Sequence, residues 1–424
     1  SFDYVFAPPD AGTFWYHPHV GAAHQVDRGL YGVLIVEEAD PLEPLSDVVM
    51  VIDDWWLLDS GAIEEEAFGD MMVAANGGRM GNWLTVNSIS RPRLAAPPGE
   101  RVRLRLVNAA NARVMRLVFR NADPRLLAID GQPLPSPRAL AGEPLELPPG
   151  GRADVGLPRG LDPVTVAVDI EGEILDLAFI DRKVEPEPEP EPEPESEPEG
   201  EVQAAPKGDD RAGAEADDKV QGKVFAKVVS VPRAKPKAQV RSQAKAEAKP
   251  EAQPSAPTLI EADAGDFAPL PANPLPATLD LAAALAVSLV LEGGAHGGML
   301  GAVMDGRRMT MGDLLKSGKT WAMNGQAGLG DDPLLTTERG RVVAMTVENK
   351  TGWTHALHLH GHHVRVVEDL ARDNEDPVWR DTVLIEPQTR LTVAFLADNP
   401  GKWVLECHVL EHGEAGMMTW LKVT

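Results

Sequence analysis

The sequence predicts an all-β protein made of tandem β-sandwich domains. Short apolar runs with alternating polarity, each bounded by Gly, Pro, Asp or Asn, recur along most of the chain. Two long stretches of the chain also resemble each other, as duplicated domains do. Helix signals are scarce, and the segment MGDLLKSGK at 311–319 is the best candidate for a short helix.

Composition excludes several classes of protein. The 424 residues correspond to about three domains, and a hydrophobic content of 43% is high enough to build real cores. No apolar run approaches the roughly 18 residues that a membrane span needs. The chain carries 65 acidic and 40 basic side chains, for a net charge of −25. This balance argues against nucleic acid as a partner, because such binding depends on basic patches.

The strand pattern is clearest at Glu100–Asn108, ERVRLRLVN, where apolar and Arg side chains alternate. Such alternation predicts a strand with one buried face. Three further segments are expected to be short strands that end at turn residues: Tyr31–Glu38, Ser46–Trp55 and Leu391–Gly401.

An internal repeat defines the domains. Segment 83–119 matches segment 321–359 in the order of a Trp, an Asn, a loop, an Arg-Val strand that ends at an Asn, and another strand. The match continues between 146–157 and 386–396. We interpret these stretches as two copies of one β-domain.

A third, partial copy lies at the start of the chain. GTFWYHPH at 12–19 aligns with GKWVLECH at 401–408, so that His17 corresponds to Glu406 and His19 to His408. Eleven residues precede this point in the first copy, against roughly 80 in the last copy. We therefore expect the sequence to be a fragment whose first domain lacks most of its strands.

Segment 184–257 separates the two complete copies. It begins VEPEPEPEPEPESEPEG and stays rich in Glu, Lys, Ala and Pro, a composition that favours an extended, solvated and disordered linker. We interpret it as a spacer rather than a binding segment. The predicted organisation is the end of a first domain at 1–42, a second domain at 43–183, the linker, and a third domain at 258–424.

Candidate metal ligands gather near the C-terminus, where seven of the eleven histidines lie. His355, His358 and His360 form an H-x-x-H-x-H motif. Side chains two apart on a strand share a face, so His358 and His360 point one way and His355 points the other. One strand could therefore serve two metal sites.

A second cluster, ECHVLEHGEAGM, contains Cys407, His408, His412 and Met417. A cysteine, histidines and a more distant methionine are the ligand types of a blue-copper site. Cys407 is the one cysteine of the chain, so an internal disulfide is excluded. A zinc site of the C-x-x-C kind has no second cysteine, and a cysteine hydrolase does not account for Met417 or the three-histidine strand.

These motifs resemble the third-domain signature of the multicopper oxidases, the family that contains laccases and bacterial copper-tolerance oxidases. The H-P-H pair of His17 and His19 resembles the end of that family's first domain. Stretches such as WYHPHVGAAHQVDRGLYGVLIVEE, GGRMGNWLTVN and WRDTVLIEP are similar to bacterial three-domain members. The resemblance spans the chain except for the linker, and it implies cupredoxin-like Greek-key β-sandwich domains.

The resemblance also implies ligand roles and a reaction. His358 would bind a type 2 copper, and electrons would pass from a type 1 copper through Cys407 and His408 to a trinuclear cluster that reduces O2 to water. The reductants would be phenols, aromatic amines or metal ions, and four coppers would be bound, or fewer in a truncated chain. The type 1 ligands would be His355, Cys407, His412 and Met417. The type 3 ligands would be His17, His19, His360 and His408.

Two departures from the family pattern keep a second hypothesis open. The family's other H-x-H motif has no counterpart in the chain, since His24 and His296 stand alone. The family's H-C-H is here Glu406-Cys407-His408, and a carboxylate is a harder ligand than imidazole. The alternative is therefore an electron-transfer or scaffold protein with a type 1 copper and an impaired trinuclear cluster.

Weaker signals have simpler interpretations. The methionines at 299–311 could bind cuprous ions, but packing is the preferred reading. Asp381 could order the type 1 site or form a salt bridge, and Glu411, His362 and His363 are expected to be solvated. Family resemblance implies export to the periplasm or outside the cell.

Overall fold

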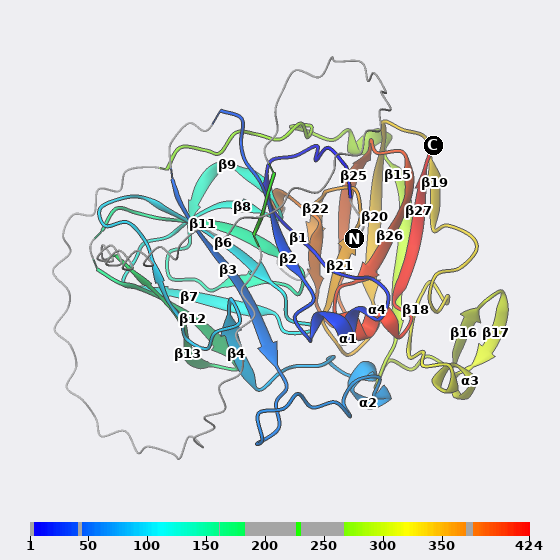
Figure 1. The fold of residues 1–424 in the computed structure, drawn as a ribbon. Coiled ribbons are helices and arrows are strands. Elements are labelled where there is room, and N and C mark those ends of the chain that lie inside the picture. Colours follow the sequence, from blue (N-terminus) through cyan, green and yellow to red (C-terminus); the bar gives the residue numbers. More distant parts are fainter. Residues whose placement is uncertain (1–3, 41–44, 161, 183–225, 230–266, 370–375) are drawn as a thin grey trace, which may run out of the picture.

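The computed structural model describes residues 4–40, 45–160, 162–182, 226–229, 267–369 and 376–424. Two β-sandwiches lie side by side, and β1 (Gly12–Tyr16), β2 (Gly32–Val36) and helix α1 (Ala22–Val26) lie at their junction (Figure 1). The all-β prediction is confirmed. The described residues contain no helix long and apolar enough to span a membrane.

The first sandwich consists of a six-stranded and a five-stranded sheet. In sheet order, the larger sheet contains β4 (Trp83–Val86), β3 (Ser46–Trp55), β6 (Val102–Asn108), β11 (Arg152–Leu157), β8 (Arg125–Ile129) and β9 (Gln132–Ala139). The smaller sheet contains β10 (Leu145–Leu147), β7 (Met115–Arg120), β12 (Val164–Ile170), β13 (Glu173–Asp181) and β5 (Arg93–Ala95). Their inner faces enclose one hydrophobic core.

The second sandwich repeats this arrangement strand for strand around its own core. Its larger sheet contains β18 (Trp321–Met323), β15 (Leu285–Gly293), β20 (Arg341–Asn349), β25 (Arg390–Ala397), β22 (Val364–Asp369) and β23 (Asp376–Arg380). Its smaller sheet contains β19 (Leu335–Thr337), β27 (Met418–Val423), β26 (Gly401–Cys407), β21 (His355–Leu359) and β24 (Thr382–Ile385). A single 3₁₀ turn, Leu281–Ala283, precedes β15.

Matching asparagines show why the repeat was visible in the sequence. Asn87 and Asn324 follow β4 and β18 with φ values of 52° and 50°, a conformation that Asn tolerates better than most residues. The Asn87 side chain accepts a hydrogen bond from the Val51 amide at 2.9 Å, and Asn324 accepts one from Val290 at 2.7 Å. The same hydrogen-bonded Asn turn therefore follows the corresponding strand, β4 or β18, in each sandwich.

Strand β1 begins, as β26 does, at a glycine with a positive φ value. Gly12 and Gly401 begin β1 and β26 with φ values of 143° and 148°, where a side chain would be strained. Beyond this start, β1 packs against β6 and β11 of the first sandwich, and α1 packs against α4 (Leu410–Glu414) of the second.

Strand β6 differs from the expectation of one buried face. All seven of its residues are buried, including Arg103 and Arg105. Arg103 donates to Asp154 at 2.6 Å and to Glu38 at 2.8 Å, and Arg105 donates to Thr13 at 3.0 Å. The prediction was wrong because β1 and β2 cover the arginine face, which the local pattern of β6 could not show.

Most of the segment expected to be a linker lies outside the described residues. Four residues within it, β14 (Ala226–Val229), form a strand that pairs antiparallel with β2 on the edge opposite β1. This differs from the expected disorder, because the sequence AKVV has β-branched residues that favour a strand when an edge is available. The proposed domain boundaries stay predictions.

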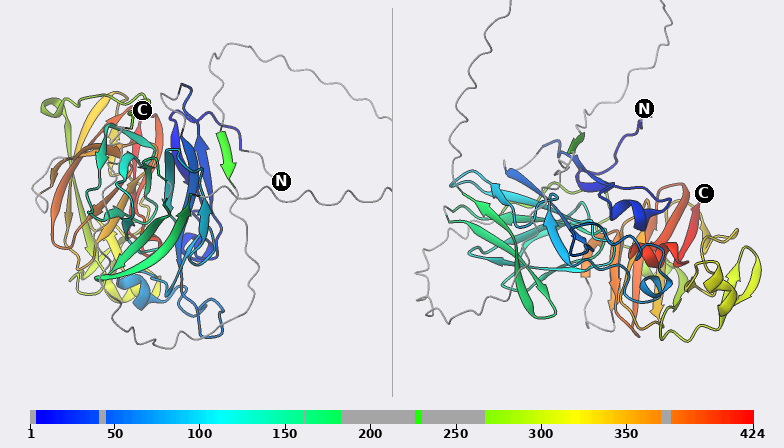
Figure 2. Two further views of the ribbon diagram at one scale, coloured as in Figure 1. Left: turned by 90° about the vertical axis from the view of Figure 1, so that its left-hand side faces the viewer. Right: turned by 60° about the horizontal axis from the view of Figure 1, so that its bottom comes forward.

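Helix α3 (Met311–Lys316) confirms the one short helix expected, and the Thr310 hydroxyl caps its first turn by accepting from the Asp313 amide. It lies with the hairpin of β16 (Gly301–Met304) and β17 (Arg307–Thr310) at the edge of the second sandwich (Figure 2). The methionines of this segment pack around buried Ala302 and Leu314, as the packing interpretation expected.

We expect Asp154→Asn to destabilise the chain by about 3–5 kcal/mol, because two buried guanidinium groups would lose the fully buried carboxylate that they share and keep only Glu38 and Asp47 as counter-charges. Burial alone would raise the pKa of Asp154, but Arg103 and Arg105 lower it overall. The stabilisation is therefore present above the ordinary carboxyl pKa and is lost as the pH falls through the lowered value. Urea unfolding measures the change.

The matched control is Asp123→Asn, which breaks an exposed ion pair with Arg125. It should cost about 0–1 kcal/mol. Equal effects of the two substitutions would contradict the stabilising role that we assign to the ion pairs of Asp154 with Arg103 and Arg105.

Candidate metal centre

The candidate ligands are arranged by the pairing of β21 with β26. Leu357 lies opposite Cys407 and His358 lies opposite Glu406 in this antiparallel pair. Because side chains alternate along each strand, the two strands present two distinct ligand sets. The core face carries His355 and Cys407, and the opposite face carries His358, His360, Glu406 and His408.

The core face contains a compact group of one sulfur and two nitrogens. The Cys407 Sγ lies 3.5 Å from His355 Nδ1 and 3.7 Å from His412 Nδ1, and the two nitrogens are 3.1 Å apart. All three residues are buried. Three donor atoms this close together can bind one metal ion.

Neighbouring groups fix the orientation of both imidazoles. His412 Nε2 donates to the Asn76 carbonyl oxygen at 2.7 Å, and His355 Nε2 lies 2.7 Å from the Thr351 hydroxyl. The hydroxyl itself lies 2.8 Å from Asn349 Oδ1, which can only accept, so the Thr351 hydroxyl donates there and accepts from His355. Each Nδ1 lone pair therefore points toward the thiol, as in a preorganised metal site.

Met417 lies in the same core and is fully buried. The Cys407 amide donates to the Met417 carbonyl at 3.0 Å, and the Met417 amide donates to the His412 carbonyl at 2.9 Å. Cys407, His412 and Met417 are thus linked through their backbones. Their assignment as copper ligands stays a prediction.

Burial keeps this group uncharged without a metal. It raises the pKa of the Cys407 thiol to about 12 and lowers the pKa of His412 to about 4. Burial, followed by the neighbouring His412, lowers the pKa of His355 well below its ordinary value. A metal would displace the thiol proton and find two neutral imidazoles, and this soft donor set suits copper.

The opposite face lines a cavity of about 890 Å³. We call this cavity the chamber, and besides His362 and His363 it is lined by five predicted ligands from both ends of the chain, which we call the chamber histidines: His17, His19, His358, His360 and His408. His408 Nε2 lies 3.3 Å from His17 Nε2, and His17 Nδ1 lies 3.2 Å from the Pro18 carbonyl, to which it can donate. Within the described chain, the buried Nδ1 of His408 has no hydrogen-bond partner.

Glu406 lies beside two of the chamber histidines. Its Oε1 lies 3.1 Å from His360 Nε2 and 3.6 Å from His19 Nδ1. Burial alone would raise the pKa of Glu406, but the hydrogen bond from His360 lowers it overall, so the carboxylate is ionised. These three residues form a second group whose donor atoms can bind one ion.

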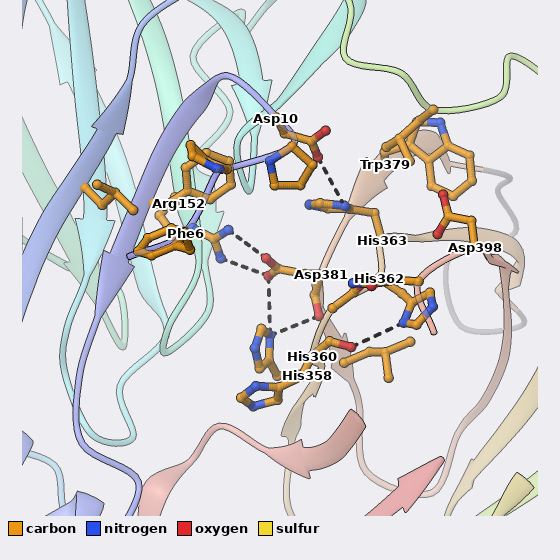
Figure 3. Close-up of a pocket in the computed structure, with 18 of the residues that line it drawn as sticks. Phe6, Asp10, Arg152, His358, His360, His362, His363, Trp379, Asp381 and Asp398 are labelled. Carbon is orange, nitrogen blue, oxygen red and sulfur yellow. Dashed lines mark hydrogen bonds and ion pairs between the residues drawn. The ribbon is translucent and has the colours of Figure 1, made fainter. Parts of the chain in front are cut away.

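His358 is oriented by an ion pair between the sandwiches (Figure 3). Its Nδ1 lies 3.1 Å from the Asp381 carbonyl, to which it can donate, leaving Nε2 as the lone-pair nitrogen. The Asp381 carboxylate accepts from both terminal nitrogens of Arg152, at 2.8 Å and 2.6 Å. Despite burial, Arg152 holds the pKa of Asp381 well below its usual range. Asp381 therefore acts at the chamber rather than at the type 1 group.

Two residues expected to be solvated are buried. Glu411 accepts from Asn111 Nδ2 at 2.7 Å and from the Arg79 amide at 3.2 Å, and burial raises its pKa. His362 packs against Phe395 and Trp403. The expectation was wrong for both because contacts between distant segments cover them.

Two family comparisons bear on these residues. Residues 305–424 and residues 1–41 each match the family described as multicopper oxidase, and these two ranges contain all nine predicted ligands. The chain belongs to the multicopper oxidase family. Its members are oxidoreductases that reduce O2.

Individual relatives differ in how much of their length is matched. The iron transport multicopper oxidase fio1 of Schizosaccharomyces pombe is 40% identical over 93 residues, which cover 19% of this chain and 15% of that protein. The multicopper oxidase MmcO of Mycobacterium tuberculosis is 24% identical over 99% of this chain and 71% of its own length. A multicopper oxidase structure from Pseudomonas thermotolerans has a TM-score of 0.68 and 26% identity, over 100% of this chain and 79% of that one.

Sequence reasoning missed the supporting residues Thr351, Arg152 and Asp130. Asp130 accepts from the Asp381 amide at 3.1 Å and so fixes the loop that holds His358. Thr351 lies four residues before His355, a spacing that could have suggested a local hydrogen bond. Arg152 and Asp130 come from the other sandwich, and no local signal points to them.

We expect Thr351→Val to weaken metal binding at the Cys407 group by about 10–100-fold, because His355 loses the acceptor that orients its ring. Competition with a colorimetric copper chelator measures the affinity. Thr336→Val, an exposed threonine on β19, is the control and should leave the affinity unchanged. Equal affinities in all three proteins would refute this role.

Proposed function

We propose that this protein is a copper-dependent oxidase that takes single electrons at the Cys407 group and reduces O2 to water in the chamber. One observation carries the proposal. Cys407 and His408 are adjacent in the chain, yet their side chains lie in the two different ligand sets. A short covalent path therefore joins the two sites.

The chain's own residues have distinct tasks in this proposal. His355, His412, Cys407 and Met417 would hold the type 1 copper, while the chamber histidines would hold copper at the cluster. Copper supplies one-electron chemistry, because thiolate and imidazole ligands support both of its common oxidation states. Thr351 and Asn76 orient the type 1 imidazoles, and Asp381 with Arg152 orients His358.

The reductants that fit this proposal are phenols, aromatic amines or metal ions. These classes come from family resemblance, as does export to the periplasm or outside the cell.

A second candidate function is electron transfer without O2 reduction. Glu406 favours it, because a carboxylate stands where the family motif has a chamber imidazole. This alternative keeps the whole Cys407 group and requires no working cluster. The two candidates differ in copper content and in O2 consumption.

The test is the absorption spectrum, copper content and O2 uptake of the copper-loaded full chain with a phenolic reductant. We expect an intense blue thiolate band that disappears in Cys407→Ser together with O2 uptake. His296→Asn is the control, since this exposed histidine lies in no ligand group of the described chain and Asn tolerates its φ of 70°.

The outcomes separate the candidates. The blue band with O2 uptake supports the oxidase. The blue band with about one copper and no O2 uptake leaves the electron-transfer function. Absence of the blue band contradicts both, because both need copper at Cys407.

A further inference from the structure

The edge of the His412 imidazole that faces away from Cys407 is covered by a loop of the first sandwich. This loop joins β3 to β4 and contains the short helix α2 (Met71–Ala75), which packs against α4, the helix that contains His412 (Figure 1). His412 Nε2 donates to the Asn76 carbonyl at 2.7 Å, and His412 is fully buried. A reductant in solvent therefore has no direct access to this imidazole.

Three consecutive carbonyls of the loop, those of residues 74–76, accept hydrogen bonds from the second sandwich. The donors are, in that order, the Trp321 indole at 2.6 Å, the Ala295 amide at 2.6 Å and His412 Nε2 at 2.7 Å. We call residues 74–76 the cover. Because three separate elements donate to it, the cover is held more firmly than the His412 bond alone would hold it.

Trp321 connects the cover to both imidazoles of the Cys407 group. Its fully buried ring lies 4.4 Å from the His412 ring and 5.1 Å from the His355 ring, centroid to centroid. Its indole N–H donates to the cover. Phenylalanine at this position would keep an aromatic ring beside the two imidazoles but would lose the bond to the cover.

The far end of the loop is anchored to α4 as well. The Arg79 amide donates to the Glu411 carboxylate at 3.2 Å, and the buried Arg79 side chain forms an ion pair with Asp27. The same guanidinium donates to the carbonyls of Trp56 and Glu64 at 3.4 Å and 3.2 Å. A buried guanidinium with these partners is costly to displace, so it holds the loop against α4.

The cover is thin, yet it prevents contact. Asn76 is half-buried and bonds directly to His412, so a single residue separates the imidazole from solvent. An electron can cross such a layer. A hydrogen bond from the imidazole to a reductant cannot form, because the Nε2 proton is already donated to the cover.

Reductants differ in how much they need this contact. One-electron oxidation of a phenol breaks its O–H bond, sends the electron to the copper and releases the proton to water. That reaction is fastest when the phenol oxygen is held close to the electron acceptor. A metal complex gives up an electron alone and needs no such bond, so a covered imidazole should slow phenols more than metal complexes.

We propose that residues 74–76, held by Trp321 and Ala295, are a cover that keeps reductants from direct contact with His412 and so favours metal complexes over phenols. This inference rests on the proposed function for the type 1 copper at Cys407, and it does not depend on the chamber. Trp321 is a positioning residue, because its indole acts on His412 through the cover.

The test is anaerobic bleaching of the blue band of the copper-loaded full chain, followed by stopped-flow absorption with two reductants. Hexaammineruthenium(II) donates an electron alone, whereas 2,6-dimethoxyphenol donates an electron and releases a proton. We expect the phenol to bleach Trp321→Phe about tenfold faster than the parent, and the ruthenium complex to stay within about threefold of the parent rate.

A second variant and a control make the test specific. Asn76→Gly gives the cover backbone more freedom without touching Trp321, and it should accelerate the phenol in the same way. Trp83→Phe replaces an exposed tryptophan on β4 and should match the parent with both reductants.

Hydrogen exchange of the same copper-loaded samples, measured by mass spectrometry, reports on the cover itself. The Ala295 amide donates to the cover, so it should be protected in the parent and in Trp83→Phe. It should exchange faster in Trp321→Phe and Asn76→Gly, while the amides of β20 keep the parent protection. This comparison separates a loosened cover from general destabilisation of the sandwich.

Several results would overturn the proposal. Equal acceleration of both reductants in Trp321→Phe indicates a changed copper potential rather than a cover. Phenol rates that stay at the parent value in both variants, or an Ala295 amide that exchanges freely in the parent, exclude the cover. Failure of O2 reduction shows separately in O2 uptake, which anaerobic bleaching does not require, whereas absence of the blue band contradicts the proposed function and this inference together.

Discussion

The register between β21 and β26 is the constraint on which both candidate sites depend. Leu357 lies opposite Cys407, and His358 lies opposite Glu406. A shift of one residue would turn every side chain of a strand to the other face. The thiol would then leave the core that contains His355 and His412, and Glu406 would leave the chamber.

Contacts between distant segments stabilise that register and bring both ends of the chain to the chamber. The Arg152–Asp381 ion pair joins the two sandwiches beside His358, and α1, which follows the N-terminal histidines in the chain, packs against α4. Beneath this contact, Arg79 forms a buried ion pair with Asp27, and Asn111 bonds to Glu411. Buried pairs of this kind are costly to break singly, so the two ends of the chain are held together.

The sequence was sufficient for the features that depend on local pattern. Alternation of apolar side chains located the strands, the repeated Asn turns revealed the duplication, and the spacing of His355, His358 and His360 separated the two faces. Ligand chemistry then singled out Cys407 and His412. The assignments of strands and of their two faces succeeded because a strand has a fixed period of two, while the ligand assignments stay predictions.

Features that depend on what covers an element could not be predicted in this way. Arg103 and Arg105 alternate as a solvated face would, and only β1 and β2 explain their burial. Glu411 and His362 were placed in solvent for the same reason. The support of His355 by Thr351 depends on a loop conformation that no periodicity encodes.

The most direct measurement of the central claim is a crystal structure of the chain loaded with copper, with anomalous scattering recorded at the copper absorption edge. The account expects copper among His355, Cys407 and His412, and further copper on the opposite face among the chamber histidines. Copper on only one face of the β21–β26 pair, or copper at Cys407 without His355 and His412, would contradict it.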